Sequence, residues 1–231
     1  MNEKYQWIEF YEEFANKLYT YANRKDELFE IMKEFESSYY YFQYLKLDKK
    51  EWWESRNYTI DPFSAMAVMN RGLTDDNRII IGELYAERFN ISSPVPTMFA
   101  GIPVLNNMRS FLGDTEDNSQ WTLFEEALEY AKTKVVTNQL VNAFDNVRNI
   151  GGNGLAMVTI VLYWIRPNVF MPLDSISRNY IPDKYNIKVP SLTSGGEEYF
   201  NFLQNLESVA GNIPFYEISY EARLNLSLIH I

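Results

Sequence analysis

Residues 149–180 read NIGGNGLAMVTIVLYWIRPNVFMPLDSISRNY and carry the strongest local structural signals in the chain. Three glycines, Gly151, Gly152 and Gly154, precede an apolar run from Leu155 to Ile165. Glycine permits positive φ and a close backbone approach, and the first N–H groups of a helix have no partner within that helix. The pattern therefore predicts a backbone anion site at this turn, and the alternative is a tight turn that only precedes a buried helix.

The same segment contains a second helix start. Arg166-Pro167-Asn168 ends the apolar run, because proline lacks an N–H group and restricts the residue before it. Asp174-Ser175 then supplies residue types that are preferred at a helix N-cap. Asp174 therefore has two compatible interpretations, as a cap that accepts backbone N–H bonds and as a functional carboxylate at the mouth of a cleft.

Helical spacing of apolar residues recurs on both sides of this segment. Apolar and charged side chains alternate with helical periodicity from Trp7 to Tyr21 and again from Lys25 to Tyr44. Asp61-Pro62 pairs an N-cap with a proline at the first helical position, and Thr74 caps the next helix. Further helices are expected at residues 75–89, 120–132, 136–149 and 197–209. The predicted fold class is mostly α.

The domain organisation follows from breaks in this pattern. A polar stretch separates the first two helices from the rest, and one or two short strands are expected only near Thr59 and Phe215. The ending LSLIHI does not continue the preceding pattern and reads as the end of a truncated sequence. We therefore expect an N-terminal helical pair (1–47), a linker (48–60), a helical domain (61–222) and a truncated or artefactual tail (223–231).

Composition limits the function classes. With 231 residues, 46% of them hydrophobic, the chain can bury one sizeable core or two small ones. The absence of cysteine fits a reducing cytoplasm and excludes disulfides, thiolate metal sites and cysteine nucleophiles. No apolar run is long enough to span a bilayer, so a cytoplasmic protein without a membrane partner is expected. The only histidine, His230, lies in the tail, which removes histidine-based triads and metal sites, and we expect no metal and no cofactor in this fragment.

The formal charge of −10 argues against a nucleic-acid binder that relies on bulk electrostatics. The charge is unevenly distributed, however. Acids crowd residues 3–36 and 114–129, whereas Arg148, Arg166 and Arg178 bracket the glycine turn with Asp174 as the only acid among them. An acidic chain can therefore still present one basic face.

The glycine turn and Asp174 together resemble the helix-hairpin-helix motif of the DNA glycosylase superfamily that includes endonuclease III. Gly152-Asn153-Gly154 matches the hairpin, and Asp174 follows Gly152 by 22 positions, where the family places a buried functional Asp. Residues 61–75, with Asp61-Pro62-Phe63 at their start, are similar to the family's early helix and loop. The resemblance implies a helix-hairpin-helix, glycosylase-like helical domain over roughly residues 61–181.

The chain departs from that family at chemically important positions. Bifunctional members carry a nucleophilic Lys two residues after the second hairpin glycine, and Ala156 stands there instead. No amine is available at that position for a Schiff base. The lack of cysteine excludes the iron–sulfur cluster of some members.

A broader resemblance links the chain to the region that precedes the AAA+ motor in McrB-like restriction GTPases. The segments that carry it are WIEFYEEFA (7–15), DPFSAMAVMNRGLTDDNR (61–78), SPVPTMFAGIPVLNNMRSF (93–111), the Trp121 helix, LYWIRPNVFMPLDSISRNYI (162–181) and ISYEA (218–222). In that family an N-terminal domain selects DNA, often by a modified base, and the motor couples to a nuclease subunit. No Walker A pattern occurs in these 231 residues.

These resemblances imply a set of candidate site residues. The backbone amides of Gly152 and Gly154, with Asn153 between them, are expected to hold a phosphate with help from Arg166 or Arg178. Further candidates for DNA contact are Asn70 and Arg71, which would probe the duplex, and Asn106 and Asn107, which could instead cap a helix. Asp174 is the candidate catalytic residue.

Three functional hypotheses follow. The first is a DNA-recognition domain of a modification-dependent, McrB-like restriction system, with duplex DNA, a AAA+ motor in the same polypeptide and a nuclease subunit as partners. The second is a monofunctional DNA glycosylase that uses Asp174 to stabilise a cationic sugar. The third is a protein-interaction or oligomerisation module, which the acidic charge favours.

Overall fold

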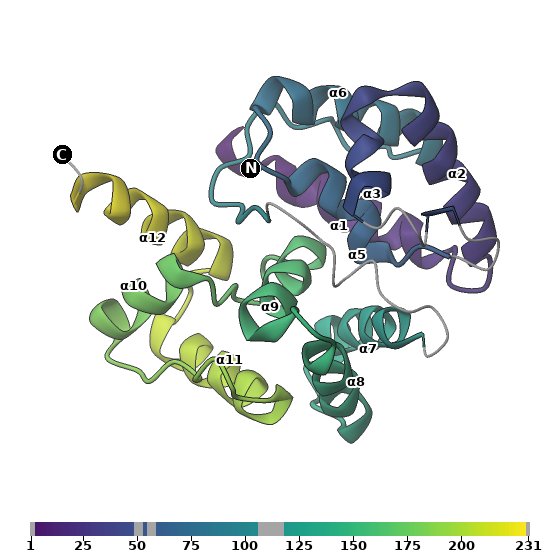
Figure 1. The fold of residues 1–231 in the computed structure, drawn as a ribbon. Coiled ribbons are helices and arrows are strands. Elements are labelled where there is room, and N and C mark those ends of the chain that lie inside the picture. Colours follow the sequence, from purple (N-terminus) through teal and green to yellow (C-terminus); the bar gives the residue numbers. More distant parts are fainter. Residues whose placement is uncertain (1–2, 49–52, 55–58, 106–117, 230–231) are drawn as a thin grey trace. The chain divides into compact units, whose positions relative to one another are not determined.

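The computed structural model describes residues 3–48, 53–54, 59–105 and 118–229. Its regular structure in these ranges is helical, without strands, which confirms the mostly-α class (Figure 1). The chain forms two compact units. The first comprises Met1–Phe99 with Val104–Glu125, and the second comprises Ala100–Pro103 with Glu126–Ile231.

The first unit is built from helices in the first half of the chain. They are α1 (Trp7–Tyr19), α2 (Lys25–Ser38), α3 (Gln43–Asp48), α5 (Pro62–Ala67) and α6 (Asp75–Phe89), with the 3-10 turns η1 (Glu3–Tyr5), η2 (Tyr40–Phe42) and η3 (Val68–Asn70). The capping signals act as predicted. The Asp61 side chain accepts a hydrogen bond from the Ser64 N–H, and the Thr74 side chain accepts one from the Asn77 N–H.

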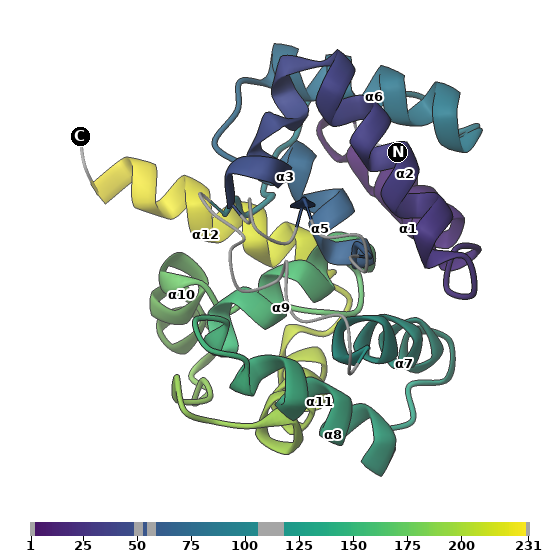
Figure 2. The same ribbon diagram turned by 45° about the vertical axis from the view of Figure 1, so that its right-hand side comes forward.

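Tyr85 of α6 lies at the centre of the first unit. Its ring centroid lies 4.5 Å from that of Phe14 and 5.6 Å from that of Phe42, and its hydroxyl donates to the Ala65 carbonyl at 2.6 Å. Aromatic rings from α1, η2 and α6 thus share one core with α5. Figure 2 shows these helices together in the first unit.

This arrangement differs from the division expected from the sequence. Residues 61–99 belong with the N-terminal helices, because α5 and α6 both pack on α1. The expected linker also contributes to this core, since the Trp53 ring lies edge-on against Phe29 at 5.2 Å. The polar residues around Trp53 suggested a linker, but the burial of the indole outweighs them.

The second unit surrounds α9. Its helices are α8 (Asn138–Asn149), α9 (Gly154–Ile165), α10 (Ser175–Tyr185), α11 (Gly196–Ala210) and α12 (Phe215–Ile229), and α7 (Ser119–Thr133) crosses the boundary between the units. From Val158 to Ile165 every side chain of α9 is buried, as expected for a helix that is apolar on all sides. Figures 1 and 2 show α9 among the other helices of this unit, with α10 beside α12.

Three local expectations are corrected. Phe215 begins α12 and is not in a strand, and Thr59 lies in irregular backbone. Helix α10 includes Pro182 and continues to Tyr185. Helix α12 runs to Ile229, so the boundary expected at residue 223 falls inside a helix.

No helix in the described part of the chain is both long enough and apolar enough to cross a membrane.

Candidate nucleic-acid interface

The glycine turn joins α8 to α9 as the sequence predicted. Helix α8 ends at Asn149, and α9 begins at Gly154, and the two helices pack against each other. Gly152 has φ 92° and Gly154 has φ 59°, both in the region that favours glycine. A hydrogen bond from the Asn153 N–H to the Ile150 carbonyl, at 3.0 Å, closes the turn.

The outer face of this turn is open. Gly151, Gly152 and Gly154 are exposed, and a Cβ added at Gly151 or Gly154 would meet no atom within 4 Å. The N-terminus of α9 contributes N–H groups that have no intrahelical partner, and its first turn contains no acidic residue. An anion can therefore approach the backbone closely at this point.

Asn153 does not face outward with the glycines, which corrects its assignment as a DNA contact. Its side chain is 4% exposed, and its Nδ2 donates to the Val147 carbonyl at 2.8 Å. Asn153 therefore ties the turn to the last turn of α8 from the inside. Its buried Oδ1 has no hydrogen-bond partner.

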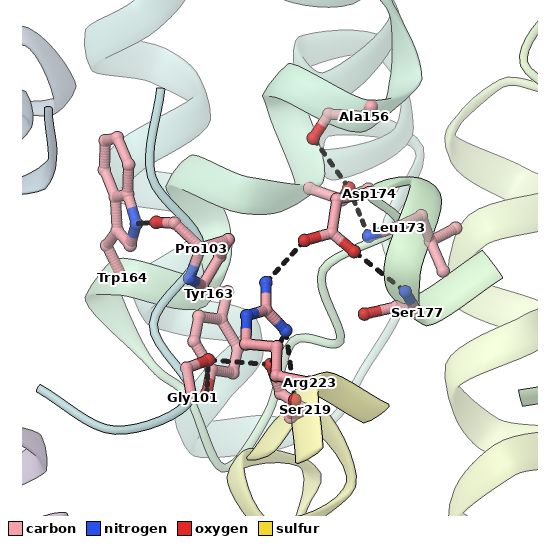
Figure 3. Close-up of polar contacts among 11 residues, drawn as sticks. Gly101, Pro103, Ala156, Tyr163, Trp164, Leu173, Asp174, Ser177, Ser219 and Arg223 are labelled. Carbon is pink, nitrogen blue, oxygen red and sulfur yellow. Dashed lines mark hydrogen bonds and ion pairs between the residues drawn. The ribbon is translucent and has the colours of Figure 1, made fainter. Parts of the chain in front are cut away.

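Asp174 is the N-cap of α10, and both of its carboxylate oxygens have partners (Figure 3). Oδ1 accepts a hydrogen bond from the Ser177 N–H at 2.9 Å, and Oδ2 forms an ion pair with the Arg223 guanidinium. The side chains of Asp174 and Arg223 are 16% and 19% exposed. The carboxylate is thus held in place at the edge of the core.

A short chain of hydrogen bonds places Asp174 beside the N-terminal half of α9. The N–H of the preceding residue, Leu173, donates to Thr159 Oγ1 at 2.9 Å, and that hydroxyl donates to the Ala156 carbonyl at 3.0 Å. Figure 3 shows this connection above the Asp174 carboxylate. The start of α10 and the N-terminal half of α9 are therefore neighbours.

Arg223 is the residue that sequence reasoning missed, because it was assigned to the tail. Its Nη1 donates to the Ser219 carbonyl at 3.0 Å and to Ser219 Oγ at 2.8 Å, which directs the guanidinium toward Asp174. Ser219 Oγ in turn donates to the Gly101 carbonyl at 2.8 Å (Figure 3). An Arg one turn after a Ser on an amphipathic helix was the only sequence signal, and it does not identify the partner 49 positions away.

Neither of the two arginines expected to assist the turn has a free guanidinium pointing to it. Arg166 lies at the C-terminal end of α9, which at about 1.5 Å per residue is roughly 18 Å from the glycine turn. Its Nη1 donates to the Ile165 carbonyl. Arg178 donates from Nη1 to the Pro190 carbonyl and thereby fastens the loop after α10.

The candidate DNA contacts of the first unit divide into described and undescribed residues. Asn70 is fully buried, where it accepts a hydrogen bond from the Tyr11 hydroxyl at 2.8 Å and donates to the Met66 carbonyl at 3.1 Å. It therefore cannot probe a duplex. Arg71 is 8% exposed, with its guanidinium carbon 4.4 Å from the ring centroid of Tyr44. Asn106 and Asn107 lie outside the described residues.

Within the described ranges, no group of three or more His, Cys, Asp or Glu side chains is arranged to hold a metal ion. The second unit thus offers an open glycine turn and a largely buried Asp174–Arg223 ion pair as its candidate site features.

Comparison with known proteins identifies the family. No curated protein and no solved structure shows significant similarity to the chain. A family model described as "Domain of unknown function (DUF8425)" matches residues 7–225 and so spans both units. The chain belongs to this family.

Proposed function

We propose that this chain is a DNA-recognition domain of a modification-dependent, McrB-like restriction system, and that the turn between α8 and α9 holds a phosphate of the duplex. The observation that carries the proposal is the open glycine turn at the start of α9. In this reading the partners are duplex DNA, a AAA+ motor in the same polypeptide and a nuclease subunit.

Backbone recognition of phosphate suits a chain with a formal charge of −10. Amide N–H groups and the positive end of a helix dipole attract an anion without a dense field of lysines. Such contacts position a protein on DNA without reading its sequence, so base selection has to come from other groups. A moderate affinity per copy is sufficient when several copies act together on one duplex.

The environment of Asp174 favours binding over glycosidic hydrolysis. A hydrolytic role requires a carboxylate that faces the sugar and a water molecule, whereas both oxygens of Asp174 already serve Ser177 and Arg223. Ala156 supplies no amine for the alternative covalent route. The carboxylate therefore has a structural function that accounts for its position.

The test is duplex binding by fluorescence anisotropy with matched variants at Gly151. This residue is exposed, and an added side chain there meets no atom within 4 Å. Gly151→Glu places a carboxylate beside the phosphate, and Gly151→Gln places an uncharged group of nearly the same shape. We expect Gly151→Glu to weaken binding by about tenfold or more, and Gly151→Gln to stay within about threefold of wild type, since one unfavourable charge contact is worth about 1.4 kcal/mol or more.

Two further measurements complete the test. Wild-type affinity should fall with rising salt, and it should differ between duplexes of one sequence with and without modified bases. Equal effects of Gly151→Glu and Gly151→Gln would exclude the turn as the phosphate site. Formation of abasic sites in a modified duplex, lost in Asp174→Asn, would instead establish the glycosylase hypothesis.

A further inference from the structure

Arg78, in the first unit, carries a buried positive charge. It lies in the first turns of α6 and is 5% exposed, and its guanidinium carbon lies 5.1 Å from the ring centroid of Phe99. Its Nε is buried without a hydrogen-bond partner. Within the described part of the chain, no ion pair engages this guanidinium.

Such an arrangement is unfavourable in the absence of a ligand. An arginine stays protonated at all pH values at which proteins fold, so burial cannot be relieved by loss of a proton. A buried charge is normally paired or hydrogen-bonded, and stacking on an aromatic ring compensates only a part of its lost hydration. A buried polar group without a partner in a native fold needs an explanation, and an ion bound at that place is one of those that apply.

Among the described residues, Tyr11 and Asp75 belong to the electrostatic surroundings of Arg78. Burial raises the pKa of Tyr11, and the positive charge of Arg78 opposes this shift. The Tyr11 hydroxyl itself donates to Asn70. Asp75 acts on Tyr11 in the opposite sense, but its side chain is exposed to water, and no ion pair joins it to Arg78 among the described residues.

We propose that Arg78 is the cationic base of an oxyanion site in the first unit, and that its ligand is a phosphate group. The guanidinium offers a planar set of N–H donors that matches two oxygens of a phosphate at once. The site goes beyond the proposed function, because it belongs to the first unit and does not involve the glycine turn of the second. The phosphate can come from a free anion or from a nucleic acid.

The experiment measures thermal unfolding of the full chain in sodium phosphate and in sodium chloride at equal ionic strength. We expect phosphate to raise the Tm of wild type by about 3 °C or more over chloride. Arg78→Met should remove this increment, and Arg78→Lys should remove most of it, because an ammonium lacks the planar fork. The matched control is Arg88→Met on the same helix, where an exposed arginine pairs with Glu34 and its loss should leave the increment intact.

A second readout separates ligand binding from a purely structural role. In chloride, Arg78→Met should unfold at the same temperature as wild type or above it, since the substitution replaces an unpaired buried charge by an apolar side chain. In wild type, the Nε–H NMR signal of Arg78 should shift as phosphate is added. A Tm of Arg78→Met in chloride several degrees below that of Arg88→Met would overturn the proposal, as would equal Tm values of wild type in the two salts.

The source of the phosphate is resolved with a duplex oligonucleotide. If Arg78→Met weakens duplex binding and Gly151→Glu leaves the inorganic phosphate increment unchanged, the site takes a nucleic-acid phosphate. If Arg78→Met removes the inorganic increment and leaves duplex affinity unchanged, the site takes a free phosphate. If Gly151→Glu and Gly151→Gln bind duplex DNA equally well, the proposed function is refuted, and the Arg78 site is not affected.

Discussion

Replacement of Asp174 tests whether its carboxylate stabilises the second unit. The residue performs two separable tasks, as the N-cap of α10 and as the ion-pair partner of Arg223. Asn is as good an N-cap as Asp, so Asp174→Asn removes the charge and keeps the cap. Asp174→Ala removes both.

The magnitude follows from the exposure of the two side chains. Exposed ion pairs contribute about 0–1 kcal/mol, whereas removal of one partner from a fully buried pair costs about 3–5 kcal/mol. At 16% and 19% exposure the Asp174–Arg223 pair lies between these limits, and we expect Asp174→Asn to lower the free energy of unfolding by about 2 kcal/mol. Asp174→Ala should lower it by about 3 kcal/mol, because the lost cap adds about 1 kcal/mol.

The assay is urea unfolding followed by tryptophan fluorescence, arranged as a double-mutant cycle with Asp174→Asn and Arg223→Met. The two substitutions together should cost less than the sum of the single ones, with a coupling energy of about 1–2 kcal/mol. In a chain of this size Asp174→Asn should lower the Tm by about 4–8 °C. The loss should depend only weakly on salt, because a largely buried pair is poorly screened.

A coupling energy below about 0.3 kcal/mol would refute this reasoning, since that is the scatter expected of independent sites. The carboxylate would then be available to a ligand, and its environment would no longer favour binding over hydrolysis. Equal destabilisation by Asn and Ala at position 174 would show that the cap contributes nothing.

Two further predictions concern a glycine that has no room for a side chain and a buried carboxyl group with a raised pKa. Gly101→Ala should lower the free energy of unfolding of the second unit, measured in urea, by about 2–4 kcal/mol. Gly101 has φ 78°, and a Cβ at this position would lie 3.1 Å from the Tyr220 backbone. An unfolding free energy equal to that of wild type would disprove this close approach. Burial raises the pKa of Asp61 to about 7, above its ordinary 3.8. Between these two values the folded state retains a proton that the unfolded state has lost. The free energy of unfolding of wild type should therefore decrease as pH rises from about 4 to about 7. Asp61→Asn keeps the cap and should remove that part of the pH profile, and an unchanged profile in this variant would show that Asp61 ionises normally.

Structural features that depend on residues close together in the chain could be predicted from the sequence. The caps at Asp61, Thr74 and Asp174 join a side chain to a backbone N–H three positions later, so the residue type and its place before an apolar run were sufficient. Helix α6 occupies the expected residues 75–89. The glycine turn before α9 was equally clear, because few residues other than glycine adopt positive φ.

Structural features that depend on residues far apart in the chain could not be predicted from the sequence. Asn70 and Asn153 both looked like polar residues for DNA contact, yet each is buried and donates to a main-chain carbonyl. An asparagine side chain serves either purpose, and only the packing of other helices around it determines whether it faces water. The burial of Arg78 could not be predicted for the same reason, since an arginine on an amphipathic helix normally reaches solvent.

The amino-acid pattern alone thus established a helical chain with its main helix starts and the glycine turn before α9, because these features depend on residues that are close together in the chain. The folded chain alone established the two units, the Asp174–Arg223 pair and the enclosure of Arg78. Each of these joins segments that lie tens of residues apart, and their meeting depends on the burial of whole helix faces, which no short pattern encodes.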